Sequence, residues 1–347
     1  MMTNLWSRSK QFKRLISLVV IVVVSWGIYR TVDHAWAQLS ASGTSGFEWK
    51  LHPLWLVVSG LLYLLGVLPM AIFWYLSLRA LGQHPKWGET FRAFYIGGLG
   101  KYVPGKVLVV VLRTNLLRSE RVSATVAAVS VFLETLTMMA VGAFLSILMM
   151  VFWMWDHLSS HPYLFPLAVA LLIVSALPTL PPICRYLVGR LGVEKLDREI
   201  KTQLEGLRFS LILSGWCLVT VGWVLLALSL WAVLEAINIP GTDVLAHLPY
   251  FLAAVGMAIV VGFLSMIPGG AGVREYLLSI LLGTFYFEAV LHIPLPQATA
   301  LAAAVVLRLV WLIAELILAG VFLPFGRRQR IAVTEAPENN MPTEPVN

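Results

Sequence analysis

The sequence predicts an all-α protein whose helices cross a membrane several times. Of its 347 residues, 59% are hydrophobic and 12% are charged, which is about half the charged fraction of an ordinary soluble domain. The apolar residues also fall into long runs with short polar connections, and a run of about 20 such residues can cross a bilayer as a helix. Helix is the expected form because backbone groups that face lipid must be hydrogen-bonded within their own segment.

The apolar runs predict six full spans in one integral membrane domain over residues 1–330. The expected spans are Leu15–Tyr29, Leu54–Leu78, Val122–Trp155, Tyr163–Ile183, Phe209–Leu234 and Gln297–Leu323. The first run precedes Ala35-Trp36-Ala37, which also fits a cleaved signal peptide, but the charged residues between them favour a retained anchor. The tail over residues 331–347 is polar and contains proline, so we expect it to be disordered.

Basic residues indicate how the spans are oriented. Clusters of lysine and arginine lie before the first span and after the last one, which places both termini in the cytoplasm by the positive-inside rule. Basic residues also lie on both sides of Phe94–Leu112, so this segment is expected to enter and leave the membrane at the cytoplasmic face. Pro104 and Gly105 mark the point where such a re-entrant hairpin can reverse its direction.

The second half repeats this pattern with the opposite orientation. By the same counting of spans, Tyr250–Val290 must begin and end outside, and it contains Pro268, Gly269 and Gly270. It is expected to form either a second re-entrant hairpin, which we favour, or two full spans, which would make eight helices. Two such interruptions in oppositely oriented halves are typical of inverted-repeat transporters, here with half-repeats of about 1–160 and 161–330.

Seven charged residues are expected at membrane depth. They are Lys101, Lys106, Glu134, Arg274, Glu275, Arg308 and Glu315. A charge at a helix centre costs about 2.5–3.5 kcal/mol on insertion scales, so such residues are paired or face a polar cavity. Structural ion pairing, for example of Glu134 with Arg308, and a functional role both remain open. For Arg113 we favour snorkelling towards the membrane surface, and Arg308 and Glu315 share one helix face because they are two turns apart.

Two short motifs resemble nucleotide sites but lack essential parts. Gly100–Lys106 reads G-x-x-x-x-G-K, yet Val107 stands where a serine or threonine would bind magnesium. Gly270-Ala271-Gly272 begins a dinucleotide fingerprint and lacks its later glycine. We therefore expect no nucleotide, no other cofactor and no metal. The net charge of +7 is spread over groups beside apolar runs, so it indicates topology rather than nucleic-acid binding.

The stretches "GKYVPGKVLVVVLR" and "IPGGAGVRE" resemble the two signature regions of the lysylphosphatidylglycerol synthase transmembrane family, the flippase-like domain of bacterial aminoacyl-phosphatidylglycerol synthases. The similarity in order and spacing covers Leu15 to Gly326. The resemblance implies a role in lipid translocation for Tyr102, Pro104, Gly105, Lys106, Arg113, Pro268, Gly269, Gly270, Gly272, Arg274 and Glu275. The synthases also carry a soluble aminoacyl-transferase domain that this sequence lacks, so synthesis of lysylated lipid is not expected.

These observations predict a flippase- or scramblase-like lipid transporter of the bacterial inner membrane. Lys101, Lys106 and Arg274 are expected to neutralise a lipid phosphate or another polar headgroup, and Glu134, Glu275 and Glu315 are the candidate proton carriers if transport is ion-coupled. One alternative is a membrane-embedded transferase or phosphatase on polyprenyl or glycolipid substrates, with Glu275 as general base. Another is a non-transporting partner of a lipid-synthesis complex, and a homodimer is also open.

Overall fold

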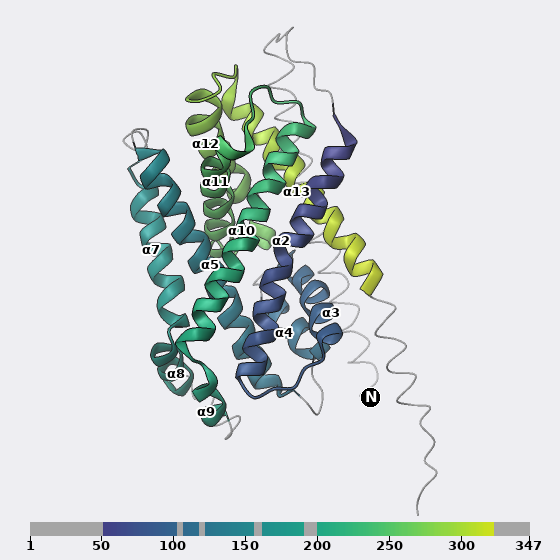
Figure 1. The fold of residues 1–347 in the computed structure, drawn as a ribbon, viewed down its shortest axis with the longest axis vertical. Coiled ribbons are helices and arrows are strands. Elements are labelled where there is room, and N and C mark those ends of the chain that lie inside the picture. The colour runs from purple at the N-terminus through teal and green to yellow at the C-terminus, as the bar shows by residue number, and fades with distance from the viewer. Residues whose placement is uncertain (1–50, 103–106, 118–121, 156–161, 191–199, 323–347) are drawn as a thin grey trace, which may run out of the picture.

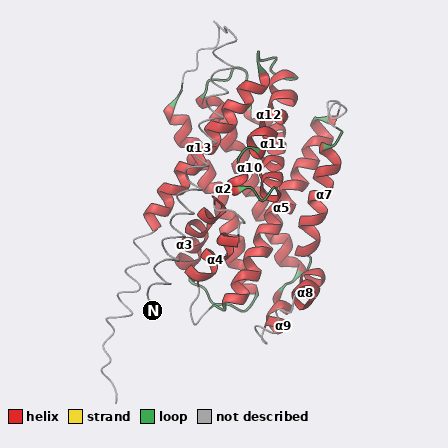
Figure 2. Ribbon diagram, turned by 180° about the vertical axis from the view of Figure 1, so that it is seen from behind, coloured by secondary structure: helices red, strands yellow, loops and turns green. Residues whose placement is uncertain are grey.

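The computed structural model describes residues 51–102, 107–117, 122–155, 162–190 and 200–322. Within these ranges the regular elements are helices, as predicted (Figure 2). The expected first span and C-terminal tail lie outside the described residues, as do the predicted site residues Pro104, Gly105 and Lys106. The chain is therefore an all-α polytopic membrane protein in the part that the structure describes.

Five of the described helices are long and apolar enough to cross a membrane. They are α2 (Pro53–Ala80), α5 (Ala124–Trp153), α10 (Phe209–Ala236), α11 (Val244–Leu264) and α13 (Pro296–Phe322). Four of them agree with predicted spans to within about two residues at most ends, because the length of an apolar run directly limits the length of a lipid-facing helix. The fifth, α11, belongs to the segment for which the sequence left two alternatives.

The predicted span Tyr163–Ile183 is broken in the structure. Helix α7 (Leu164–Ala176) leads through a short 3₁₀ turn to α8 (Pro181–Arg190), and the chain bends there by 76°. Pro178, Pro181 and Pro182 lie at the bend. Because proline lacks the backbone N–H and its ring clashes with the preceding turn, the helix cannot continue straight through them. The predicted span is therefore a bent pair of helices rather than one continuous helix.

Helices α2 and α10 form an antiparallel pair at the centre of the bundle. The N–H of His52, just before α2, donates to the carbonyl of Ala236 at the end of α10 at 2.8 Å. A Cβ on Gly222 would lie 2.6 Å from the carbonyl oxygen of Gly66, so only glycine permits this approach. The hydroxyls of Ser59 and Ser229 are 2.9 Å apart, and each also donates to the other residue's carbonyl.

The first hairpin begins and ends at the same end of the bundle. It consists of α3 (Trp87–Gly98), a 3₁₀ turn η1 (Leu99–Tyr102) and α4 (Val107–Leu117). Ser123, which precedes α5, donates its N–H to the side chain of Gln83, which follows α2, at 2.7 Å. With about 1.5 Å of rise per residue, neither α3 nor α4 can cross a bilayer of ~30 Å. The chain therefore enters and returns, as the flanking basic residues predicted.

The second hairpin begins and ends at the other end of the bundle. After α11 come a 3₁₀ turn η5 (Pro268–Gly270), α12 (Val273–Leu282) and a π-helical turn, η6, over Gly283–Glu288. The hydroxyl of Tyr286 lies 2.9 Å from Nδ1 of His247, which places the end of this hairpin beside its start. Helix α11 has the length of a full span and α12 does not, so the structure lies between the two sequence alternatives.

The start of α11 is fixed by its capping residue, Asp243. Its carboxylate accepts the N–H groups of Leu245 at 2.9 Å and Ala246 at 3.1 Å. These bonds from Ala246 and Leu245 hold the pKa of the Asp243 carboxyl below its usual value. A capped start keeps α11 from fraying at the end where the second hairpin begins.

The tips of the two hairpins meet inside the bundle. Turn η1 contacts turn η5, and a Cβ on Gly269 would lie 3.0 Å from the ring of Tyr102. In Figure 1 the pair α3 and α4 occupies the lower part of the molecule, whereas α12 occupies the upper part. The two interrupted segments therefore approach one another from opposite ends.

Single cysteines should reveal this arrangement in membranes. We expect cysteines at Lys86 and Asn115, in a background with Cys184 and Cys217 replaced by serine, to react with an impermeant maleimide from the same side, because they flank one re-entrant hairpin. A cysteine at Glu288 should react only from the opposite side. Labelling of the first two sites from different sides would show that α3 and α4 do not form a re-entrant hairpin.

Candidate functional site

A cavity of about 150 Å³ lies where the two hairpin tips meet. Its walls come from the hairpins and from α2, α5, α10 and α13. The charged residues that line it are Lys101, Arg113, Glu134, Arg274 and Glu315. Its apolar wall includes Tyr63 and Trp311, whose rings stack with centroids 4.7 Å apart. The sequence predicted four of these charges at membrane depth and included Arg113 through the family resemblance. The structure brings all five to one cavity.

Lys101 and Glu315 form the first of three ion pairs in this region. Lys101, in the first hairpin tip, contacts the Glu315 carboxylate of α13. Tyr63 of α2 donates its hydroxyl to the same oxygen, Oε1, and accepts from Lys101 at 3.3 Å. The other oxygen, Oε2, is buried and has no hydrogen-bond partner among the described residues. Glu315 is thus a neutralised carboxylate with one unused acceptor.

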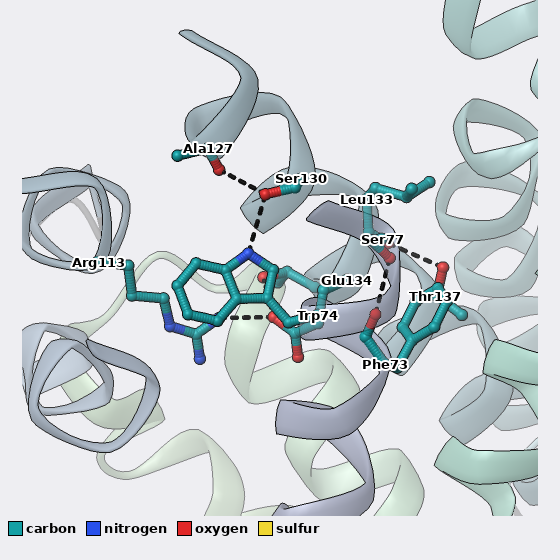
Figure 3. A network of polar contacts seen from close by, with 10 residues as sticks. Phe73, Trp74, Ser77, Arg113, Ala127, Ser130, Leu133, Glu134 and Thr137 are labelled. Carbon is teal, nitrogen blue, oxygen red and sulfur yellow. Dashed lines mark hydrogen bonds and ion pairs between the residues drawn. The ribbon is translucent and has the colours of Figure 1, made fainter. Parts of the chain in front are cut away.

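Arg113 and Glu134 form the second pair, which joins α4 to α5. Their closest atoms, Nη1 and Oε2, are 2.6 Å apart, and Thr135 lies 3.4 Å from the same oxygen. The guanidinium also lies 4.0 Å from the ring centroid of Phe94 and 5.3 Å from that of Trp74. Figure 3 shows Arg113 reaching Glu134 beside the Trp74 indole.

This second pair overturns two expectations from the sequence. Arg113 is only 6% exposed, so it does not snorkel to the membrane surface. Snorkelling was expected because Lys and Arg near a membrane face can reach towards water, but the guanidinium of Arg113 instead pairs with Glu134 of α5. The suggested pairing of Glu134 with Arg308 was also wrong, because each of these residues has a different partner.

Arg308 and Glu275 form the third pair, which joins α13 to α12. Arg308 also donates from Nη2 to the carbonyl of Gly269 at 2.9 Å. The second oxygen of Glu275 accepts the N–H of Gly272 at 2.7 Å and so caps the first turn of α12. Both carboxylate oxygens of Glu275 are therefore occupied, and Arg308 ties the second hairpin tip to a spanning helix.

Arg274 is the remaining cation of the cluster. It lines the cavity and is half-buried. Its buried Nε has no hydrogen-bond partner among the described residues, and none of the three ion pairs described above includes it. Its side chain crosses the backbone of two glycines. A Cβ on Gly262 would lie 2.5 Å from Cγ of Arg274, and a Cβ on Gly270 would lie 2.9 Å from its Nε. These glycines leave the space that the arginine occupies.

The two hairpins hold an arginine in corresponding ways. In the first, a Cβ on Gly97 of α3 would lie 2.5 Å from Cγ of Arg113 on α4. In the second, Gly262 of α11 stands in the same relation to Arg274 on α12. The difference lies in what each arginine meets, because Arg113 has a carboxylate and Arg274, within the described ranges, has none.

The remaining predicted residues shape the second tip. Gly269, Gly270 and Gly272 have positive φ angles of 59°, 67° and 82°, which favour glycine. Pro268 begins the 3₁₀ turn, where its missing N–H costs no helix bond. Tyr102 contacts Gly269, so it forms part of the junction between the tips. Pro268 and the three glycines therefore support the site by the shape of their backbone, and Tyr102 supports it by packing its ring against Gly269.

Sequence reasoning missed four residues of this site. Tyr63 and Trp311 lie in long apolar runs, where the sequence does not distinguish an aromatic residue that lines a cavity from one in the core. Gly97 and Gly262 lie inside helices, and a glycine there costs roughly 0.5–1 kcal/mol relative to alanine. That cost was a usable signal that a close neighbour requires the glycine, but the sequence does not show which neighbour.

Neutralising one member of the Arg113–Glu134 pair should destabilise the protein. Arg113→Gln or Glu134→Gln leaves the partner charged and buried, which costs about 3–5 kcal/mol, so folded yield and melting temperature should fall. The double variant leaves no uncompensated charge and should recover part of the loss. The measurement is fluorescence-detected size exclusion with a thermal ramp, and full stability of both single variants would show that the pair has no structural role.

Comparison with known proteins gives one positive finding. The chain matches the family described as lysylphosphatidylglycerol synthase TM region over residues 14–328. A search of curated proteins finds no match. The family match covers both hairpins, the spanning helices between them and every charged residue of the cavity. The chain therefore belongs to the lysylphosphatidylglycerol synthase transmembrane family.

Proposed function

We propose that this protein moves a phospholipid between the leaflets of the bacterial inner membrane and that Arg274 binds the phosphate of its headgroup. The observation that carries the proposal is a guanidinium that lines an interior cavity without a carboxylate among the described residues. Family membership supports a lipid-related role in a membrane. The orientation with cytoplasmic termini, inferred from basic residues, is part of the same proposal.

Energetics favour a ligand at Arg274. A charge inside a membrane protein that has no partner is costly and in known cases marks a substrate or ion pathway. An arginine offers a planar fork of donors that matches two phosphate oxygens at once. The Arg274 side chain packs against the backbone of Gly262 and Gly270, which limits its rotamers, so less conformational entropy is lost when its donors bind an anion.

The size of the cavity suits a headgroup alone. Its volume of about 150 Å³ is below the roughly 300–1,000 Å³ of pockets that enclose a drug-sized ligand, and a whole phospholipid is larger still. The acyl chains would remain in the bilayer while the polar group passes through the bundle. The two hairpin tips, which meet at Tyr102 and Gly269, are the elements whose separation would open the cavity towards either side.

Downhill or ion-coupled movement fits a chain with no nucleotide motif. Of the three carboxylates, Glu134 and Glu275 accept from arginines that also anchor a hairpin, so they are poor candidates for reversible protonation. Glu315 lines the cavity and keeps one unused oxygen, which makes it the best candidate for a coupling group.

The rival enzymatic function would need Glu275 as a general base. Both of its oxygens are engaged, one by Arg308 and one by the N–H of Gly272, and a base must be free to reach a substrate proton. We therefore propose a transporter rather than an enzyme. In reconstituted liposomes, leaflet exchange supports transport, a change in lipid mass supports an enzyme, and neither supports a partner role.

Replacing Arg274 tests the proposal directly. Arg274→Gln removes a charged donor, and hydrogen bonds to charged groups contribute about 1.5–3 kcal/mol, so exchange of a fluorescent anionic lipid should fall roughly ten- to hundred-fold. Arg274→Lys should keep part of the activity because it keeps the charge. Arg79→Gln, an exposed arginine at the end of α2, is the matched control. Unchanged exchange by folded Arg274→Gln would refute the role of this residue.

A second test addresses the glycine that positions Arg274. Gly262→Ala should reduce anionic-lipid exchange, because its methyl group would displace the arginine. If it acts only through Arg274, the double variant Gly262→Ala/Arg274→Gln should exchange lipid no more slowly than Arg274→Gln alone. Gly142→Ala, whose methyl group would collide with the Trp223 ring, is the control for a clash inside a helix and should lower the melting temperature without changing headgroup preference.

A further inference from the structure

The charge balance of the cavity restricts the headgroup that it can hold. The described residues at the hairpin tips provide three carboxylates, and each already has a cation: Glu315 has Lys101, Glu134 has Arg113 and Glu275 has Arg308. Arg274 is the cation left over in the part of the chain that is described. Counted over the described residues, the cavity therefore leaves one cation for a negative charge and no unpaired carboxylate for a positive one.

We propose that the cavity selects a phospholipid with a singly charged phosphodiester and an uncharged hydroxyl-bearing headgroup, such as glycerol, and discriminates against headgroups that carry an ammonium. This inference rests on the proposed function and names the substrate class of the same site. It separates this chain from the lysylated lipid in the name of its family, whose headgroup carries ammonium groups.

Each carboxylate among the described residues of the cavity is already paired with a cation, so none is left for an ammonium. Aromatic faces can hold such a group, but the Phe94 face is covered by Arg113 at 4.0 Å. The rings of Tyr63 and Trp311 stack on each other.

A hydroxyl fits the acceptor that the structure leaves unused. Oε2 of Glu315 is buried without a hydrogen-bond partner among the described residues, while Oε1 receives Lys101 and Tyr63. A hydroxyl donates one hydrogen bond and adds no charge. An ammonium at the same place would lie close to the Lys101 ammonium, and like charges in a poorly hydrated site repel strongly.

The same balance disfavours a doubly charged phosphate. A phosphomonoester brings about 1.5 to 2 negative charges at neutral pH, whereas the described cavity leaves one cation, Arg274, without a carboxylate. A phosphodiester brings a single negative charge, which Arg274 can bind with two donors. The phosphate and the hydroxyl then satisfy Arg274 and Glu315 within one cavity.

A headgroup series in liposomes tests the inference. The reporters carry identical acyl chains and differ in the headgroup, which is glycerol, lysyl-glycerol, ethanolamine or none, the last being a phosphomonoester. Because like-charge juxtaposition costs several kcal/mol, the wild-type protein should exchange the glycerol reporter at least about ten-fold faster than the two ammonium reporters. It should also exchange it faster than the phosphomonoester.

Each result decides something different. Equal or faster exchange of an ammonium reporter overturns the headgroup inference and leaves lipid transport standing. Equal exchange of the phosphomonoester overturns the requirement for a single charge. Exchange of no reporter at all overturns the proposed function together with the inference.

One variant should change the selectivity in a defined direction. Lys101→Gln leaves Glu315 without its cation, so the cavity gains a free carboxylate, and exchange of the ethanolamine reporter should rise relative to the glycerol reporter. Lys86→Gln, an exposed lysine before α3, is the matched control and should leave the ratio unchanged. An unchanged ratio in folded Lys101→Gln overturns the charge-balance argument, and if that variant does not fold, the wild-type headgroup series still decides.

Discussion

Neutralisation of charge inside the bundle is the constraint on which this structure depends. Each of three buried or half-buried carboxylates meets a cation from another element, and every pair joins a hairpin to a spanning helix. Lys101 binds the first tip to α13, Arg113 binds α4 to α5, and Arg308 binds the second hairpin to α13. The helices of the hairpins that are too short to span a bilayer, α3, α4 and α12, gain little from lipid contact, so these pairs, with helix packing, hold them in position.

The two hairpins share a local design and differ in one charge. In both, a glycine inside the entering helix makes room for an arginine on the returning helix. Arg113 continues to Glu134 and becomes structural, whereas Arg274 faces the cavity. The two arginines therefore have different roles, because α5 provides a carboxylate, Glu134, beside the first hairpin. The chemistry of the site follows from this asymmetry between the halves.

Much of the fold could be predicted from the sequence, and the pairing of charges could not. The lengths of apolar runs and the proline positions are local properties, so spans such as α2 and α10 and the interruption at Pro268 could be read directly. The bend at Pro181 was missed because its apolar flanks outweighed the prolines. The partner of Glu134 depends on which faces of α4, α5 and α13 meet, and helix periodicity alone does not define those contacts.

The broken helices also explain why so many cations gather in one place. A helix that ends inside a membrane leaves carbonyl groups without intrahelical partners, and each must be satisfied by protein or by water. Arg308 does this for Gly269 while it neutralises Glu275, so its donors are divided between backbone and side chain. Arg274 follows Gly269 in the same hairpin, at the start of α12. Among the described residues, it neither stabilises a carbonyl nor pairs with a carboxylate. A cation that packs against two glycine backbones and stabilises neither a carbonyl nor a carboxylate is costly to bury. A ligand that accepts its hydrogen bonds would offset that cost.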